Sequence, residues 1–314
     1  MLKIFALLFT AILVFLILAE LSLRVFLGLG QPPLMVADEQ IGYFFKENQD
    51  LNRFGNRITY NGYHQRSDQL KEDSHYRILM LGDSVTNGGV LTDQSETITE
   101  MLEDQINNLH QAKGEVLNAS AGSWAIENEY EYIKRFGFFY SDIVILQINT
   151  DDFFQPKSTA DKVGTINLPN KNPPSAIYEL LNRYIIHKYI LSPDKDAVSS
   201  YEAILSTDNQ FKRNLDILLQ IIKLAEEHNK RLIVLLTPYK NELDNEVYYD
   251  ERKEIIDVLE EKDIPYINLL NRELDLRKAH FRDRIHFNEE GNKIIVNSIL
   301  ELLNNNNLLT IANN

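Results

Sequence analysis

The longest run of apolar residues in this chain lies at its N-terminus. Within residues 4–19 only Thr10 is polar, and the apolar character continues to residue 29 with interruptions at Glu20 and Arg24. A helix of about 20 apolar residues is long enough to cross the hydrocarbon core of a bilayer. The pattern therefore predicts a membrane-spanning helix that precedes the folded body of the protein.

Residues 1–30 admit three interpretations, of which we favour an uncleaved signal anchor. A cleaved signal peptide has a shorter apolar core and ends in a small-x-small site, and no clear site of that kind follows here. A buried core helix is the third interpretation, but a helix that is apolar on every face is not expected in a core this close to a terminus. Lys3 and the terminal amine precede the run and favour a cytoplasmic N-terminus, although Arg24 opposes this orientation. We expect the protein to be membrane-anchored, with its folded body in the periplasm or at the cell surface.

Short apolar runs further along the chain predict buried strands. The first is Tyr76–Leu81, which is ended by Gly82. Four more such runs follow, at residues 115–118, 142–148, 231–236 and 264–269. Between them, apolar residues recur at helical spacing, over residues 95–110, 209–229, 246–262 and 289–303. Strands that alternate with helices predict an α/β fold, in which a parallel sheet carries helices on both faces, within one domain at 76–303.

Three segments depart from this alternation. Residues 31–75 carry turn signals and polar aromatic residues, which predict a linker and a lead-in of short irregular strands. Residues 153–205 are rich in Pro, Lys and Tyr and contain one amphipathic piece near 176–190. An insertion of this length is either a lid or binding loop, or a solvated excursion without a role. Residues 304–314 are of low complexity, and we expect this tail to fray.

The amino-acid composition excludes several kinds of binding partner and active site, but it says little about the fold. The chain has 314 residues, 32 basic and 46 acidic side chains, and a net charge of −14. Such an acidic protein is poorly suited to nucleic acid, because a phosphate backbone attracts a basic surface. The chain contains no cysteine, which excludes disulfides, thiolate metal sites and a cysteine nucleophile.

Polar and small residues follow the predicted strands directly. Gly82-Asp83-Ser84 follows the first strand, residues 118–124 (NASAGSW) follow the second, and residues 149–152 (NTDD) follow the third. Near the C-terminus, residues 283–286 (DRIH) precede the last predicted helix. The carboxyl ends of parallel strands form one edge of a sheet, where ligands bind in such folds. We therefore expect these segments to meet at that edge.

These residue types fit nucleophilic catalysis. The hydroxyl of Ser84 becomes a good nucleophile only when a base accepts its proton, and His286 can act as that base near neutral pH. Asp283, three residues earlier, can accept a hydrogen bond from the imidazole and so fix its tautomer. The backbone N–H groups of Ser84 and Gly122 can stabilise the oxyanion that forms during attack on a carbonyl. Each piece also has an ordinary structural alternative, such as a turn with a helix cap or a loop glycine. The prediction of a catalytic triad therefore depends on the serine, glycine, aspartate and histidine segments all occurring in the expected order along the chain, at the ends of strands.

In these segments the sequence resembles the SGNH/GDSL hydrolases, over about residues 76–303. The first family block is matched by LMLGDSVTNGGVL (79–91), which contains Ser84, and the second by LNASAGSW (117–124), which contains the glycine of the oxyanion site. The last block, Asp-x-x-His before a polar helix start, is matched by RDRIHFNEEGN (282–292). The resemblance implies a flavodoxin-like three-layer α/β/α sandwich, and ester or acyl chemistry that needs no metal or cofactor.

Two positions differ from the family pattern. The third block usually reads Gly-x-Asn-Asp and its Asn donates to the oxyanion, whereas Asp151 occupies that position here. An ionised carboxylate only accepts hydrogen bonds and repels an oxyanion. Either Asn149 takes over this role, or the oxyanion site is weaker. In addition, Gly122 follows Asn118 by four residues instead of the usual five, so that Ser123 is an alternative N–H donor.

Three functions are compatible with these features. The leading hypothesis is a serine hydrolase that cleaves ester bonds through an acyl-serine intermediate, including deacetylation of a glycan or lipid. The alternatives are an O-acyltransferase that passes the acyl group to a cell-envelope polysaccharide, and a catalytically weak binding or assembly protein that keeps the fold. We expect a small-molecule, glycan or lipid ester as substrate, contact with the membrane through the N-terminal helix, and no nucleic acid partner.

Overall fold

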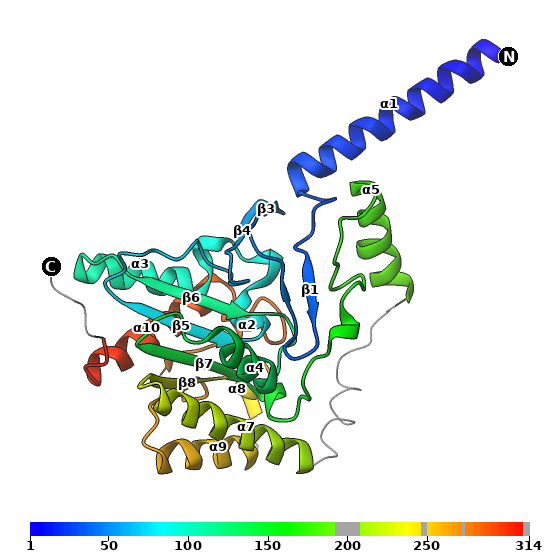
Figure 1. Cartoon of the computed structure of the whole chain (residues 1–314). Coiled ribbons are helices and arrows are strands. Elements are labelled where there is room, and N and C mark those ends of the chain that lie inside the picture. Colours follow the sequence, from blue (N-terminus) through cyan, green and yellow to red (C-terminus); the bar gives the residue numbers. More distant parts are fainter. Residues whose placement is uncertain (192–207, 246–249, 272–273, 310–314) are drawn as a thin grey trace.

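A five-stranded parallel sheet forms the centre of the protein, in the order β6-β5-β7-β8-β9 (Figure 1). The computed structural model describes residues 1–191, 208–245, 250–271 and 274–309. The strands of the sheet are β5 (Arg77–Gly82), β6 (Glu115–Ser120), β7 (Ile143–Asn149), β8 (Arg231–Thr237) and β9 (Tyr266–Asn268). Because β5 is the first of these in sequence and lies between β6 and β7, the winding of the chain reverses beside β5. In open α/β sheets this reversal point is where ligands bind.

Both faces of the sheet are buried, which explains the nearly unbroken apolar runs in its strands. In β7, Ile143 and Ile145 belong to one core and Val144 and Leu146 to the other, as the two-residue period of a strand requires. The predicted strands agree with β5 to β9 to within two residues at each end.

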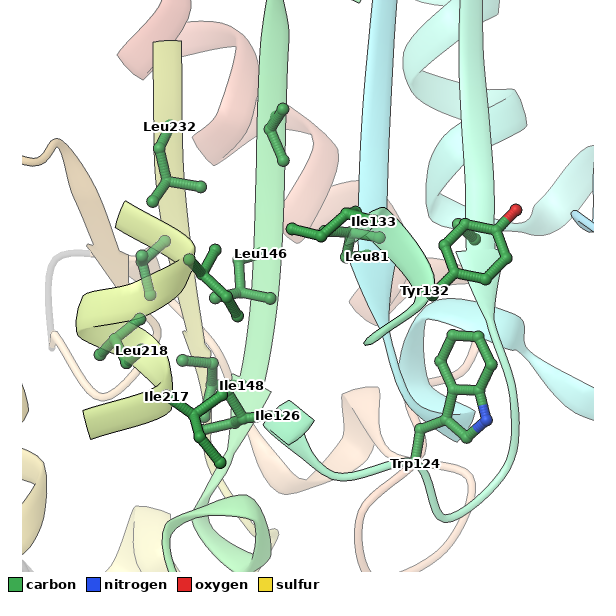
Figure 2. Packing of buried hydrophobic residues seen from close by; sticks show 14 of the residues in the cluster. Leu81, Trp124, Ile126, Tyr132, Ile133, Leu146, Ile148, Ile217, Leu218 and Leu232 are labelled. Carbon is green, nitrogen blue, oxygen red and sulfur yellow. The ribbon is translucent and has the colours of Figure 1, made fainter. Parts of the chain in front are cut away.

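Helices cover the two faces of the sheet in two layers. On one face lie α3 (Ile98–His110) and α10 (Glu289–Asn305), and on the other lie α4 (Ile126–Phe136), α7 (Asp208–Glu227) and α9 (Asp250–Glu261). Figure 2 shows Tyr132 and Ile133 of α4 and Leu218 of α7 beside Leu81 and Leu146 of the sheet, all in one core. The predicted three-layer α/β/α sandwich with a parallel central sheet is therefore confirmed.

The predicted helices correspond to α3, α7, α9 and α10, except that residues 246–249 lie outside the described part of the chain. α4 is absent from the predicted elements, although Ile126, Tyr130, Ile133 and Phe136 recur at helical spacing in its mostly polar sequence IENEYEYIKRF and its apolar face packs in the core. This helix is also supported by its charges. Glu127 and Glu129 lie in the first turn and Lys134 and Arg135 in the last, which complements the helix dipole at both ends.

The lead-in before the sheet is more regular than the sequence indicates. It forms two antiparallel hairpins, which pair β1 (Met35–Asp38) with β2 (Gly42–Phe45), and β3 (Gln49–Arg53) with β4 (Asn56–Tyr60). The remaining helical segments are short: α2 (Ser84–Asn87), η1 (Gly89–Leu91), η2 (Gln94–Glu96), η3 (Thr150–Phe153), η4 (Ala160–Lys162), α5 (Ala176–Glu179), the π-helix η5 (Leu180–Leu191), α8 (Glu242–Asn245) and η7 (Lys278–His280). Of the predicted insertion, residues 192–205 lie outside the described residues, as does the end of the C-terminal tail at 310–314. The domain boundaries and the lid function stay predictions.

α1 (Leu2–Leu27) extends away from the domain as one helix of 26 residues (Figure 1). None of its residues is buried, so the interpretation of this segment as a core helix is wrong. The helix is long and apolar enough to cross a membrane. It ends at Gly28, whose φ of 64° is the left-handed conformation in which glycine commonly terminates helices.

Candidate active site

The turn after β5 determines where the Ser84 hydroxyl lies. A Cβ at Gly82 would come within 2.3 Å of Thr86 Oγ1 and 2.5 Å of Gln147 Oε1, so only glycine fits there. The carboxylate of Asp83 accepts a hydrogen bond from the backbone N–H of Val85 at 2.8 Å and thereby caps α2. Ser84 is the first residue of α2 and is half-buried at the carboxyl edge of the sheet.

Ser84 forms one chain of hydrogen bonds with His286 and Asp283, which lie about 200 residues later in the sequence. His286 Nε2 lies 2.9 Å from Ser84 Oγ. His286 Nδ1 lies 2.8 and 3.0 Å from the two carboxylate oxygens of Asp283. An ionised carboxylate can only accept, so Nδ1 donates to Asp283 and Nε2 is left to accept the proton of the serine hydroxyl. This is the geometry that general-base activation of a serine requires.

Hydrogen bonds keep the carboxylate of Asp283 ionised. Partial burial raises the pKa of this group, but the hydrogen bond from the His286 ring outweighs it, together with those from the backbone N–H groups of His286 at 2.9 Å and Ile285 at 3.0 Å. The pKa of Asp283 therefore lies well below its usual range. At neutral pH the group is negatively charged and can stabilise an imidazolium at His286.

The second aspartate of the site, Asp83, lies in a different environment. Its side chain is 4% exposed, and burial raises its pKa to about 6 in spite of the hydrogen bond from Val85. Its Oδ2 accepts a hydrogen bond from Asn149 Nδ2 at 2.6 Å. Asp83 thus holds the loop after β7 against the turn after β5.

Asn149 and Asp151, the two candidates for the third oxyanion donor, differ in their partners. Asn149 is buried at the end of β7, and its Oδ1 accepts the backbone N–H of Asp151 at 2.7 Å. The carboxylate of Asp151 lies 3.8 Å from the guanidinium of Arg284, in the loop that carries His286. The negative charge at Asp151 is therefore partly balanced by a cation from the loop that carries His286.

Gly122 lies in the loop after β6, next to open space. A Cβ at this position would meet no atom within 4 Å. The loop is fixed from β2: the Tyr43 hydroxyl donates to the carbonyl of Gly122 at 2.6 Å, and Trp124 Nε1 donates to the carbonyl of Tyr43 at 2.7 Å. Ser123, the alternative donor, has a φ of 59°, and its carbonyl accepts a hydrogen bond from Gln155 at 2.7 Å.

Two buried carboxyl groups near Asp83 have no counterpart in the sequence-based prediction. Glu129 is fully buried on α4, and neither carboxylate oxygen has a hydrogen-bond partner among the residues that the structure describes. Burial, reinforced by the neighbouring Asp83, raises the pKa of Glu129 well above its usual value. Asp152 is buried as well and accepts the backbone N–H of Asn149 at 2.8 Å. Only Asp152 could have been noticed from the sequence, as the second acid of the NTDD segment.

A comparison with known protein families shows to which family this domain belongs. The profile of the GDSL-like lipase/acylhydrolase family matches residues 80–294, which include Ser84, Gly122, Asn149 and the loop of Asp283 and His286. This chain belongs to the GDSL-like lipase/acylhydrolase family.

Solved structures that resemble this GDSL-like protein include a lipolytic G-D-S-L protein from Veillonella parvula, at 14% identity and a TM-score of 0.43 over 73% of this chain and 98% of that one. A second is Axe2, an acetylxylan esterase from Geobacillus stearothermophilus, at 15% identity and a TM-score of 0.40 over 74% and 96% of the two chains. A third is the esterase EstA from a Pseudoalteromonas species, at 14% identity and a TM-score of 0.41 over 73% and 97%. No curated protein gives a significant match.

The GDSL-like domain contains no evident metal site in its described residues, where no group of three or more histidine, aspartate or glutamate side chains is arranged to hold an ion. The polar groups at the sheet edge consist of a hydroxyl, an imidazole, carboxylates and amides. Such a set can accept a proton from a serine, hold charge on an imidazole and donate hydrogen bonds to an oxygen.

Proposed function

We propose that this protein is a membrane-anchored serine esterase or acyl hydrolase that works through an acyl-serine intermediate. The observation that carries the proposal is the chain of hydrogen bonds from Ser84 Oγ to His286 Nε2 at 2.9 Å and from His286 Nδ1 to Asp283 at 2.8 Å. Membership of the GDSL-like family supports ester hydrolysis as the reaction class.

The proposed reaction has two halves. Ser84 Oγ attacks the carbonyl carbon of the ester while its proton passes to His286 Nε2, and the carbonyl oxygen becomes an oxyanion. The C–O bond to the leaving alcohol then breaks, and the imidazolium returns its proton to that alcohol. Water attacks the acyl-serine in the same way, with His286 accepting its proton, and releases the acid and the free serine.

The oxyanion needs hydrogen-bond donors that are held in place before the reaction. We assign this role to the backbone N–H groups of Ser84 and Gly122, with the side-chain amide of Asn149 as the third donor. Asn149 Nδ2 carries two hydrogens, and Asp83 accepts one of them. Asp151 is not assigned this role, because a carboxylate beside the guanidinium of Arg284 accepts hydrogen bonds and does not donate them.

The full chain in detergent micelles or nanodiscs provides the test. The wild type should hydrolyse p-nitrophenyl acetate and react covalently with a fluorophosphonate. Ser84→Ala should lower the rate by about 10⁴-fold or more and abolish labelling, because the nucleophile is gone. Ser95→Ala, at an exposed serine, is the matched control and should behave like the wild type. Equal rates in wild type and Ser84→Ala would instead support a binding or assembly protein.

The acyl-serine intermediate could also pass its acyl group to a sugar hydroxyl. A glycan acceptor added to the same assay separates the two reactions. Hydrolysis predicts free acid and no change in the mass of the glycan, whereas an O-acyltransferase would produce acylated glycan at the expense of free acid.

We further propose that α1 anchors the protein and that the catalytic domain lies outside the cytoplasm. The helix exposes apolar side chains along its whole length and buries none of its residues in the domain. An apolar surface of this size is stable only in lipid. Lys3, at the start of the helix, supports an inside N-terminus.

A further inference from the structure

The helical segment of α5 and η5 carries an unusual group of exposed apolar side chains. Outside Met1 and α1, eight large hydrophobic side chains are exposed among the described residues, and four of them lie here: Tyr178, Leu181, Ile185 and Ile186. We call these four the interfacial face. Tyr178, Leu181 and Ile185 follow one another at spacings of three and four residues, which places them on one side of a helix, and Ile186 extends this surface at its edge.

We propose that the interfacial face rests in the headgroup region of the bilayer that α1 crosses, so that the catalytic domain touches the membrane at a second place. This inference rests on the proposed role of α1 as an anchor. It adds a lipid contact that is made by the domain itself.

Direct contacts fix the start of α5 to the last turns of α1. The carboxylate of Glu20 accepts hydrogen bonds from the backbone N–H groups of Ala176 at 2.8 Å and Ile177 at 3.0 Å, which are unsatisfied donors at the start of a helix. The guanidinium of Arg24 donates to the same carboxylate at 2.7 Å. The anchor helix therefore caps α5.

A buried ion pair completes this connection. Arg53 and Glu179 have side chains that are only 1% and 4% exposed, and they lie 2.6 Å apart. Arg53 also donates to the carbonyl of Gly28 at 2.7 Å, and the backbone N–H of Gly30 donates to Glu179 at 2.6 Å. The chain just after α1, the β3–β4 hairpin and α5 are thus held together, because breaking a buried pair leaves an uncompensated charge.

The length of α1 determines where α5 lies relative to the membrane surface. With 26 residues, α1 is about 39 Å long, whereas the hydrocarbon core is about 30 Å thick and needs about 20 residues. If the core begins near residue 2, Glu20 and the turns after it emerge in the headgroup region, and so does the start of α5. Figure 1 shows α5 and η5 crossing the direction of α1 on the side of the domain nearest to it. A helix in this position lies along the membrane surface.

The charge of the surrounding segment favours lipid as the occupant. In a chain of net charge −14, the only acidic residue from 163 to 187 is Glu179, which is buried against Arg53. Lys171 and Arg183 line a cleft of about 330 Å³ beside Tyr178. Cations and an aromatic side chain next to an apolar face are the composition of interfacial helices.

Depth measurements on the full chain test this inference. Since the protein contains no cysteine, single nitroxide labels can be placed without further changes, at Ile185→Cys on the interfacial face, at Leu109→Cys on α3 and at Leu13→Cys in α1. Collision with oxygen reports lipid exposure and collision with a water-soluble nickel chelate reports water exposure, both in phospholipid nanodiscs. Leu109 is the matched control, as an exposed aliphatic residue of a domain helix.

The label at 185 should lie roughly 5–10 Å below the phosphate level. The label at 185 should collide with the nickel chelate severalfold less often than the label at 109. It should collide with oxygen more often than the label at 109, at a rate approaching that of the label at 13. Equal rates at 185 and 109 would overturn the inference. Protection of 185 from both reagents would also overturn it, because that pattern indicates a protein contact. A label at 13 without lipid exposure would refute the anchor itself, which distinguishes the two failures. Leu181→Cys repeats the measurement from a second position of the interfacial face.

Discussion

Two loops at the carboxyl edge of the sheet differ in how they serve Ser84. In the loop before α10, His286 and Asp283 are arranged for proton transfer, with contacts of 2.8 to 3.0 Å. In the loop after β7, the family's Asn position holds Asp151, whose carboxylate faces Arg284 at 3.8 Å. The loop before α10 matches the family pattern. The loop after β7 departs from it at Asp151, and the negative charge of Asp151 is balanced by Arg284. In this chain, the predicted oxyanion donor departs from the family pattern and the predicted proton relay does not.

The two aspartates show the same contrast in their electrostatics. Burial raises the pKa of Asp83, which serves to hold Asn149. Hydrogen bonds lower the pKa of Asp283, which accepts a hydrogen bond from the His286 ring. A carboxylate that must stay ionised is thus half-exposed and surrounded by donors, and a carboxylate that ties two loops together is buried.

The largest effect is expected from Asp283→Asn. The asparagine side chain can donate to His286 Nδ1, which stabilises the tautomer that carries its proton on Nε2 and cannot accept one from Ser84. We expect kcat for p-nitrophenyl acetate to fall by about 10⁴-fold, as in serine proteases with this change. Asp275→Asn, at an exposed aspartate outside the site, is the control. A loss below tenfold would show that Asp283 is dispensable for orienting the base.

A smaller loss is expected from Asn149→Ala. Removing one oxyanion donor usually costs about 10²–10³-fold in kcat. Fluorophosphonate labelling and hydrolysis should fall together, with little change in KM, because the missing hydrogen bond forms only in the transition state. If hydrolysis is unchanged, the amide of Asn149 serves only to bind Asp83.

The two aspartates should also respond to pH with opposite signs. The folded-state pKa of Asp83 is about 6 and its ordinary value is 3.8, so its contribution to stability is complete below about pH 4 and is lost as pH rises through 6. For Asp283 the folded-state pKa is lowered, so its contribution is complete above 3.8 and is lost as pH falls below that value.

Thermal unfolding of the two asparagine variants measures this difference. Relative to the wild type, Asp83→Asn should gain stability as pH rises from 4 to 7, by an order of 1–3 kcal/mol, because it no longer buries a charge. Asp283→Asn should show the opposite trend, losing stability relative to the wild type as pH rises from 2 to 4. Parallel curves for the two variants would contradict the contrast between the two sites.

A structural feature can be predicted from the sequence where a single physical requirement determines which residue type occupies a position. Strands such as β7 are buried on both faces, so their continuous apolar runs reveal them. Gly82 is required by close contact with Thr86 and Gln147, and a glycine before Asp-Ser is visible in the sequence. By contrast, α4 is short and mostly polar in composition, so its few apolar positions are easily overlooked, and its start is fixed by a backbone N–H of Ala125 that donates to Asn128.

In the candidate site, too, some features can be predicted from the sequence and others cannot. That Ser84, His286 and Asp283 could meet is predictable from their places after strands and before the last helix. The pairing of Asp151 with Arg284 and the burial of Asp83 and Glu129 depend on distances between segments far apart in sequence. A pattern of residue types contains no information about such distances.

The smallest expected effect, and the sharpest test of the altered loop, is that of Asp151→Asn. Exposed or half-exposed ion pairs contribute about 0–1 kcal/mol, so breaking the pair with Arg284 should change kcat by less than about fivefold. Arg284→Gln should have a similarly small effect, and the double variant should restore most of what either single change loses. A large rise in kcat for Asp151→Asn would show instead that the carboxylate opposes the oxyanion, and that an asparagine at this position takes over the donation we assign to Asn149. A large fall that 1 M salt does not reproduce in the wild type would indicate that Asp151 positions the loop by more than its charge.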